Sequence, residues 1–218
     1  MRQFGPATTI SPVVVRAGKN PATDNESMSG NRRSLLVLGS SFAIWVIYGV
    51  VAGTGHWPLG VLIGLAASVL LLLLEACLRL RIKLLDWTLL GYFLLAAYAT
   101  FLAPSARFPV YSSVVVWVLY ATVTWLSILL GVPFSLQYAR ESAPPELWHR
   151  PEFLRANVII SVVWGIAFAT NIVLVILALN PRNKPLLIGV IAPFLIMGAT
   201  SLFTSLYVGM ARQRTQQV

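Results

Sequence analysis

The chain has 218 residues, of which 57% are hydrophobic and 11% are charged, and its formal net charge is +9. So few charged residues exclude an ordinary soluble globular domain, and a single cysteine, Cys77, excludes an internal disulfide framework. The positive charge is not gathered in a soluble basic domain, so we expect no nucleic-acid partner.

The first segment, residues 1–33, is rich in Pro, Gly, Ser and Asn and has one short apolar run. This composition predicts a disordered cytoplasmic tail. No apolar core directly follows its basic start, so it does not read as a secretory signal. Translation from Met1 and translation from Met28 both remain open as the true start of the chain.

Six stretches after this tail are apolar and near the length of about 20 residues that crosses a bilayer as a helix. Backbone groups cannot stay unpaired in lipid, so these stretches are expected to be helical. We predict an all-α membrane protein with a six-helix transmembrane domain at residues 34–211 and a short cytoplasmic tail at 212–218. The predicted spans are residues 35–51, 58–78, 85–103, 109–132, 158–179 and 185–210.

The basic residues fall on one side of these spans. Thirteen of the sixteen Lys and Arg residues lie in the N-terminal tail, the second and fourth connections and the C-terminus. The positive-inside rule therefore places both termini in the cytoplasm. The three connections on the other side lead into Pro58, Pro109 and Pro185, and proline suits the first turn of a helix. The chain thus reads as three consecutive helical hairpins.

Ionisable residues inside the spans are almost absent. Glu75 lies near the predicted cytoplasmic end of the second span, and Arg79 follows at i+4, so we expect the two to pair and reach toward the headgroups. Asp86 marks the cytoplasmic start of the third span, where a carboxylate suits the helix dipole. Gly49, Gly53, Gly60 and Gly64 predict close packing of the first two helices.

Polar and aromatic residues form stripes at helical spacing on the last three predicted spans, and these stripes are expected to face one another. One interpretation is hydrogen bonding between helices, and the other is a polar cavity around a solute. The residues expected to line such a cavity are Ser113, Tyr120, Thr124, Asn157, Ser161, Asn171, Thr200 and Thr204.

The fourth connection, residues 133–156, is the most distinctive segment, because aromatic, apolar and charged residues alternate closely in it. We expect it to lie in the cytoplasmic membrane interface, with Ser142 capping a short helix that contains the prolines. One interpretation is a membrane-associated connector, and the other is a docking surface for a protein or lipid. The docking residues would be Gln137, Tyr138, Arg140, Glu141 and Trp148.

Catalytic patterns are weak. Glu146 and His149 have the Glu-x-x-His spacing of helical di-iron proteins, but the second pair and the further carboxylates that such a site needs are missing. His56 is the only other histidine, which leaves too few ligands for a zinc or haem site. We therefore expect no enzymatic activity, no cofactor and no metal.

The run from Asn157 to Trp164, with Phe168 and Asn171 after it, resembles the helix start of small bacterial inner-membrane proteins of the intracellular septation type. The final hairpin, ending in Tyr207 and Arg212, is similar to theirs, and residues 133–141 resemble uncharacterised bacterial membrane proteins of the same layout. The resemblance implies a multi-pass protein of the bacterial inner membrane, without catalytic residues and with protein partners in envelope maintenance or division.

Two functions follow from these features. The first is an accessory or scaffold protein whose fourth connection engages membrane lipids and a membrane-protein complex. The second is a small-solute or lipid transporter with its cavity between the last three predicted spans.

Overall fold

The computed structural model describes residues 43–79 and 81–216, and every regular element in these ranges is helical. The predicted tail at residues 1–33 lies outside the described residues. The long helices are α2 (Trp57–Cys77), α3 (Leu84–Ala97), α4 (Phe108–Leu129), α6 (Pro151–Ala178) and α7 (Ala192–Gln216). Two π-helical turns adjoin them, η1 (Tyr98–Leu102) after α3 and η4 (Leu187–Ile191) before α7. The short elements are α5 (Ser135–Ser142) and the 3-10 helices η2 (Pro145–Leu147) and η3 (Pro181–Asn183).

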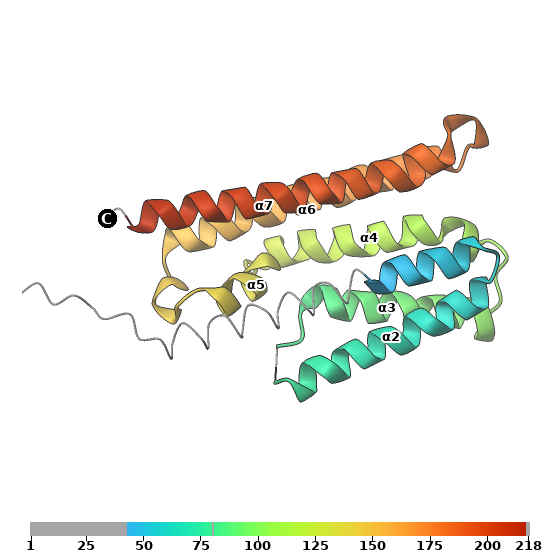
Figure 1. The fold of residues 1–218 in the computed structure, drawn as a ribbon, viewed down its shortest axis with the longest axis horizontal. Helices are drawn as coiled ribbons and strands as arrows, with labels where there is room; N and C mark the ends of the chain where they lie inside the picture. The colour runs from blue at the N-terminus through green and yellow to red at the C-terminus, as the bar shows by residue number, and fades with distance from the viewer. Residues whose placement is uncertain (1–42, 80, 217–218) are drawn as a thin grey trace, which may run out of the picture. The chain divides into compact units, whose positions relative to one another are not determined.

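Five segments of the described chain are long and apolar enough to cross a membrane (Figure 1). They correspond to the second to sixth predicted spans, with α3 and η1 forming one and η4 and α7 another. The predicted first span, residues 35–51, lies partly outside the described residues. Its described part belongs to the helix Ala43–Gly53, which by itself is too short to cross. The all-α membrane class is thus supported, and the first of the six predicted spans stays a prediction.

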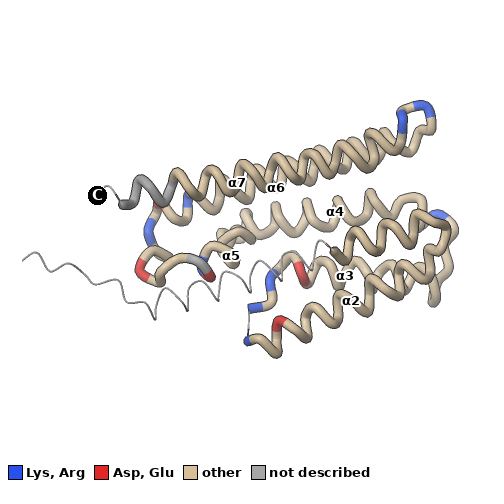
Figure 2. The backbone as a smooth tube through the Cα atoms, in the orientation of Figure 1, with Lys and Arg blue, Asp and Glu red and all other residues tan. Residues whose placement is uncertain are grey.

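Side chains are distributed as expected for helices surrounded by lipid. Large apolar side chains point outward along the helices, and Leu129 retains 80% of its possible exposure. Polar residues such as Ser68, Ser161 and Asn171 are buried instead. Lys, Arg, Asp and Glu lie at the two ends of the described helices (Figure 2). This pattern is the reverse of a soluble protein and suits a multi-pass membrane protein.

The two ends of the described helices differ. One, the α5 end, contains α5, the connection between α2 and α3 and the start of α6 (Figure 1). The other, the turn end, contains the three turns that lead into α2, α4 and the η4–α7 helix (Figure 1). Pro58 and Pro109 stand in the first turns of α2 and α4, and Pro185 begins the helical stretch before η4, as predicted.

Aromatic rings form the core beside the helix Ala43–Gly53. Tyr48 and Tyr92 join their hydroxyl groups at 2.7 Å, and the Trp57 indole N–H donates to the Thr100 hydroxyl at 3.0 Å. Trp45 contacts both Tyr92 and Phe93 through its ring. These contacts bring α2, α3 and the helix Ala43–Gly53 together around one apolar cluster.

The glycines of the first two helices differ in their roles. Gly60 approaches the backbone of Ala52 so closely that a Cβ at position 60 would lie 3.1 Å from the Ala52 nitrogen, which confirms close packing at this point. Gly64 instead makes room for the ring of Phe93 on α3. Gly49 and Gly53 have open space around them. Only one of the four glycines therefore brings these two helix backbones close together.

The largest differences from the predicted boundaries are at the start of α6 and the end of α7. α6 begins at Pro151 instead of residue 158, because Pro151 fits the first helical turn and Glu152 suits the positive end of the helix dipole. α7 continues to Gln216, so residues 212–216 of the predicted tail are helical, and their cytoplasmic location stays a prediction. Hydropathy marks only the apolar part of a helix, and both helices also include polar residues beyond that part.

Candidate functional site

The segment after α4 reverses the chain. α4 ends at Leu129, and Gly131 takes a left-handed φ of 73°, where the lack of a Cβ removes the steric penalty. The backbone N–H of Phe134 then donates to the hydroxyl of Ser127 at 3.0 Å. These two features fold α5 back against α6 and against the connection between α2 and α3.

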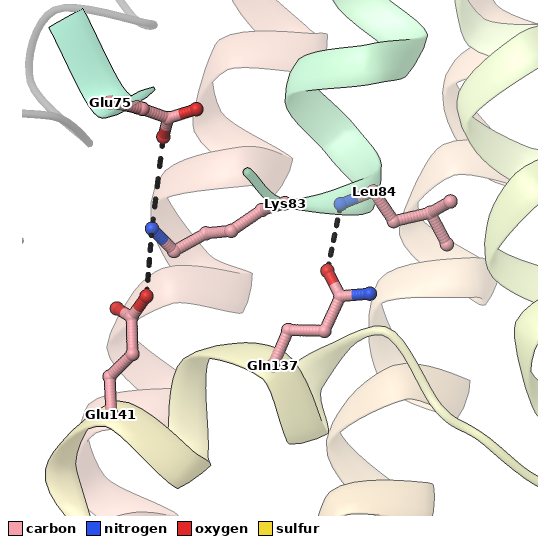
Figure 3. Close-up of polar contacts among 5 residues, drawn as sticks. All are labelled: Glu75, Lys83, Leu84, Gln137 and Glu141. Atoms are coloured by element: carbon pink, nitrogen blue, oxygen red, sulfur yellow. Dashed lines mark hydrogen bonds and ion pairs between the residues drawn. The ribbon is translucent and has the colours of Figure 1, made fainter. Parts of the chain in front are cut away.

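Lys83, which directly precedes α3, is the centre of a buried charged cluster. Its Nζ lies 3.2 Å from Glu141 Oε1 on α5 and 3.8 Å from Glu75 Oε1 on α2 (Figure 3). Glu75 has no exposed surface and Lys83 retains 3%, whereas the side chain of Glu141 keeps 20%. Asp86, in the first turn of α3, is also buried and acts electrostatically on Glu75. One lysine thus joins α2, α3 and α5.

α5 also supplies a cap to α3. The first backbone N–H groups of a helix have no partner within it, and α3 receives no side-chain cap from Lys83. The side-chain carbonyl oxygen of Gln137 accepts a hydrogen bond from the backbone N–H of Leu84 at 2.7 Å (Figure 3). A residue more than fifty positions away therefore completes the start of α3 and fixes the position of α5.

Aromatic side chains complete the α5 contacts. Lys83 Nζ lies 5.4 Å from the centre of the Tyr138 ring, and the Arg140 guanidinium lies 5.6 Å from the centre of the Trp148 ring. Burial raises the pKa of the Tyr138 hydroxyl above its ordinary value, and nearby carboxylates such as Asp86 act in the same direction. Tyr138 therefore remains a neutral phenol at physiological pH.

Two sequence predictions about these elements are wrong. Glu75 pairs with Lys83 and not with Arg79, because the chain turns at Arg79, which has a left-handed φ of 55°, and no longer continues the α2 helix. The N-cap position of the proline-containing helix η2 is Pro144 and not Ser142, which is the last residue of α5. Asp86 does lie at the start of α3, as predicted.

The five predicted docking residues are engaged with other parts of the same chain. Gln137 and Glu141 contact the connection before α3, and Tyr138 lies beside Lys83. Arg140 stacks on Trp148, whose indole N–H donates to the Ala143 carbonyl at 3.0 Å. These contacts give the five residues an internal role, and docking of a partner there stays a prediction.

Polar residues of α6 meet α5 in a second network. The Ser135 hydroxyl donates to the backbone and side-chain oxygens of Asn157 at 2.8 and 3.0 Å, and the Ser161 hydroxyl donates to Ser135 at 3.0 Å. Asn157 in turn donates to the Phe153 carbonyl at 2.9 Å. Asn157 and Ser161, which the sequence assigned to a cavity, are therefore hydrogen-bonded and buried.

The predicted stripes do meet across helix interfaces farther along α6. The Trp164 indole N–H donates to the Thr204 hydroxyl on α7 at 3.0 Å, and Thr204 donates to the carbonyl of Thr200, which is buried. Phe168 contacts the rings of Tyr120 and Trp117 on α4 at centroid distances of 5.5 and 6.1 Å. Side-chain contacts thus join α6 to α4 on one side and to α7 on the other.

Two buried polar side chains of these helices have no hydrogen-bond partner. Asn171 on α6 has no exposed surface, and neither its amide nitrogen nor its carbonyl oxygen is hydrogen-bonded. Thr124 on α4 is equally buried, and its hydroxyl is also unpaired. Burying an unpaired amide costs about 1–3 kcal/mol by protein mutational data. Asn171 is therefore an energetically costly residue at this position.

Ser113 lies apart from the other predicted cavity residues. It is exposed and lines a groove of about 180 Å³ between α4, α6 and the η4 region, near the turn end. The groove is otherwise apolar, with Val110, Val175, Ala178 and Val190 among its lining residues. None of the other seven predicted residues lines this groove.

The sequence reasoning missed the central residue of the charged cluster. The charge bias of the connections does not distinguish Lys83 from other cations, yet Lys83 is buried and its near neighbour Arg81 is exposed. One sequence feature distinguishes Lys83, because it is the single lysine beside Arg79 and Arg81 in the connection between α2 and α3. A compact ammonium with three donors suits contact with several carboxylates.

The described fold and its polar interior define the chain as a helical protein with the features of a multi-pass membrane protein. Comparison with family models, with curated proteins and with solved structures found no match. The resemblance to septation proteins, the bacterial inner-membrane location and the absence of enzymatic activity therefore stay predictions.

Proposed function

We propose that the protein is a membrane carrier for a small, uncharged solute that forms hydrogen bonds, and that this solute passes between α4 and α6. The observation that carries the proposal is Asn171, a fully buried amide with neither polar atom paired. It lies seven residues before the end of α6, about 10 Å along the helix axis, and within an apolar membrane-spanning segment. An amide offers one acceptor group and two N–H donors to a passing solute.

The surroundings of Asn171 support a neutral solute. The polar residues between the α5 end and Asn171 carry hydroxyl and amide groups, as in Ser161, Thr124 and Asn157. α4 contains no charged residue, and the charged residues of α6 are confined to its first turns, at Glu152 and Arg155. A charged solute would find no opposite charge along this interface, whereas a neutral one would find hydrogen-bond partners.

The experiment compares the glycerol and urea permeability of vesicles that contain the purified protein, followed by stopped-flow light scattering. We expect wild-type vesicles to admit at least one of the two probes faster than protein-free vesicles. Asn171→Leu, which keeps a similar size and removes both polar groups, is expected to reduce the rate to that of protein-free vesicles. The matched control is Thr170→Val, because Thr170 is the neighbouring residue and is exposed. Wild-type rates equal to those of protein-free vesicles for both probes would refute the proposal.

The same substitution has a separate effect on stability. Because Asn171 is buried and unpaired, Asn171→Leu is expected to raise the free energy of unfolding by about 1–3 kcal/mol. Thermal unfolding in a mild detergent measures this change. A variant that is more stable than wild type and yet impermeable to the probe cannot owe its loss of flux to misfolding. A less stable variant would contradict the assignment of Asn171 as an unpaired group.

A further inference from the structure

The turn end of the described helices has a charge that the carrier proposal does not use. Its turns contain Arg107, Arg182 and Lys184, all exposed (Figure 2). The carboxylates of the described residues, Glu75, Asp86, Glu141, Glu146 and Glu152, belong instead to α2, α3 and the segments of the α5 end. Neither of the ion pairs found within the described chain involves the three cations of the turn end. This end therefore presents positive charge without a described acidic residue nearby.

Two of these cations lie close in the sequence to residues that line the groove of about 180 Å³. Lys184 directly precedes Pro185, which lines the groove on the α7 side, and Arg107 stands three residues before Val110, which lines it on the α4 side. The lining is apolar except for Ser113, which lies about 8 Å along α4 from its first residue. Positive charge thus flanks the end of the groove, and one hydroxyl follows before the apolar interior.

We propose that this groove binds an anionic phospholipid, with one acyl chain in the groove and the headgroup phosphate at the cations of the turn end. The apolar walls suit a hydrocarbon chain, and the groove lies on a segment that is long and apolar enough to be surrounded by lipid. The charged nitrogens of Arg and Lys donate charge-assisted hydrogen bonds to phosphate oxygens, which suits an acidic headgroup. Ser113, the one hydroxyl among the lining residues, offers a hydrogen-bond donor to an ester oxygen of that lipid.

This site adjoins the solute path of the carrier proposal, because both lie along α4 and α6, but the two sites use different residues. The groove reaches Val175, which lies one turn beyond Asn171 on the same face of α6. Asn171 itself does not line it. Lipid binding therefore stands whether or not the protein carries a solute.

The experiment measures lipid binding to the full-length protein in a mild detergent by native mass spectrometry, with phosphatidylglycerol and phosphatidylcholine as the two probes. Wild-type protein is expected to retain phosphatidylglycerol preferentially. Arg182→Gln with Lys184→Gln removes two charge contacts and is expected to weaken phosphatidylglycerol binding about 30-fold. Val190→Phe adds bulk inside the groove and is expected to weaken it as well. The matched control is Arg150→Gln with Arg155→Gln, two exposed cations at the start of α6.

Each alternative gives a different result. Equal affinity of the wild type for the two lipids, or an unchanged affinity in the Arg182/Lys184 variant, would overturn the proposal. Loss of binding in the charge variant without loss in Val190→Phe would place the headgroup at the turns but no chain in the groove, and would also overturn it. A dimer that Val190→Phe dissociates would assign the groove to a second copy of the chain. Arg107→Gln is a single substitution that tests the charge contact if the double variant does not fold.

Discussion

Lys83→Met tests whether the charged cluster holds the α5 end together. Methionine has a similar length and no charge, so the change removes the ammonium group from between Glu75 and Glu141. At an effective dielectric constant of 20, two unit charges at the 3.8 Å distance between Lys83 and Glu75 attract by about 4 kcal/mol. Removing one partner of a buried pair typically costs about 3–5 kcal/mol, because the other charge stays buried. The ion pair between Lys83 and Glu141 contributes less than about 1 kcal/mol to the free energy of unfolding, because the Glu141 side chain is partly exposed.

Thermal unfolding of the purified protein in a mild detergent measures the effect. A loss of about 3–5 kcal/mol corresponds to a fall of about 6–20 °C in Tm for a domain of this size. Arg81→Met is the matched control, because Arg81 is an exposed cation in the same connection, and it is expected to change stability by less than about 0.5 kcal/mol. Adding Glu75→Gln to Lys83→Met removes the stranded charge and should restore at least half of the loss. If Lys83→Met unfolds at the same temperature as Arg81→Met, the cluster does not stabilise the fold.

Three further predictions concern packing, hydrogen bonding and topology. Gly64→Ala places a methyl group against the ring of Phe93 and should lower the free energy of unfolding by about 1–3 kcal/mol. Combining it with Phe93→Leu should reduce this cost, and a double variant whose loss equals the sum of the two single losses would contradict the contact. Trp164→Phe removes the 3.0 Å hydrogen bond to Thr204 and should lower the free energy of unfolding by about 0.6–1.7 kcal/mol, measured by thermal unfolding. Adding Thr204→Val to Trp164→Phe should lower it little further. A reporter fused after Val218 should be active in the cytoplasm if the charge bias sets the topology, and a signal on the other side of the membrane would refute the predicted orientation.

The spans themselves could be predicted because the requirement to pair backbone groups in lipid leaves a long apolar stretch little choice but a helix. The side-chain contacts of Trp164 with α7 and of Phe168 with α4 could also be predicted, because residues three or four apart in the sequence lie on one face of a helix. Such patterns are local, and they need only the geometry of one helix at a time.

The charged cluster could not be predicted in the same way, because its members are far apart in the sequence. Glu75 has three cations within the next eight residues, Arg79, Arg81 and Lys83, and helical spacing favours Arg79. The pairing depends on where the chain leaves the helix, and α2 ends at Cys77, before Arg79. The cap that Gln137 gives to Leu84 depends on the path of the whole segment after α4, which no local pattern specifies.

The π-helical turn η4 has a consequence for which length changes the chain tolerates. A π turn inside a helix accommodates one additional residue while the helix on either side keeps its direction. Deleting one residue from Leu187–Ile191 should therefore leave a regular helix in which Thr204 still reaches Trp164. Around Ser201 the helix is regular, so deleting one residue there would rotate Thr204 by about 100° about the helix axis, away from Trp164. Natural relatives of this chain should accordingly vary in length within η4 and be constant in length between Ala192 and Thr204.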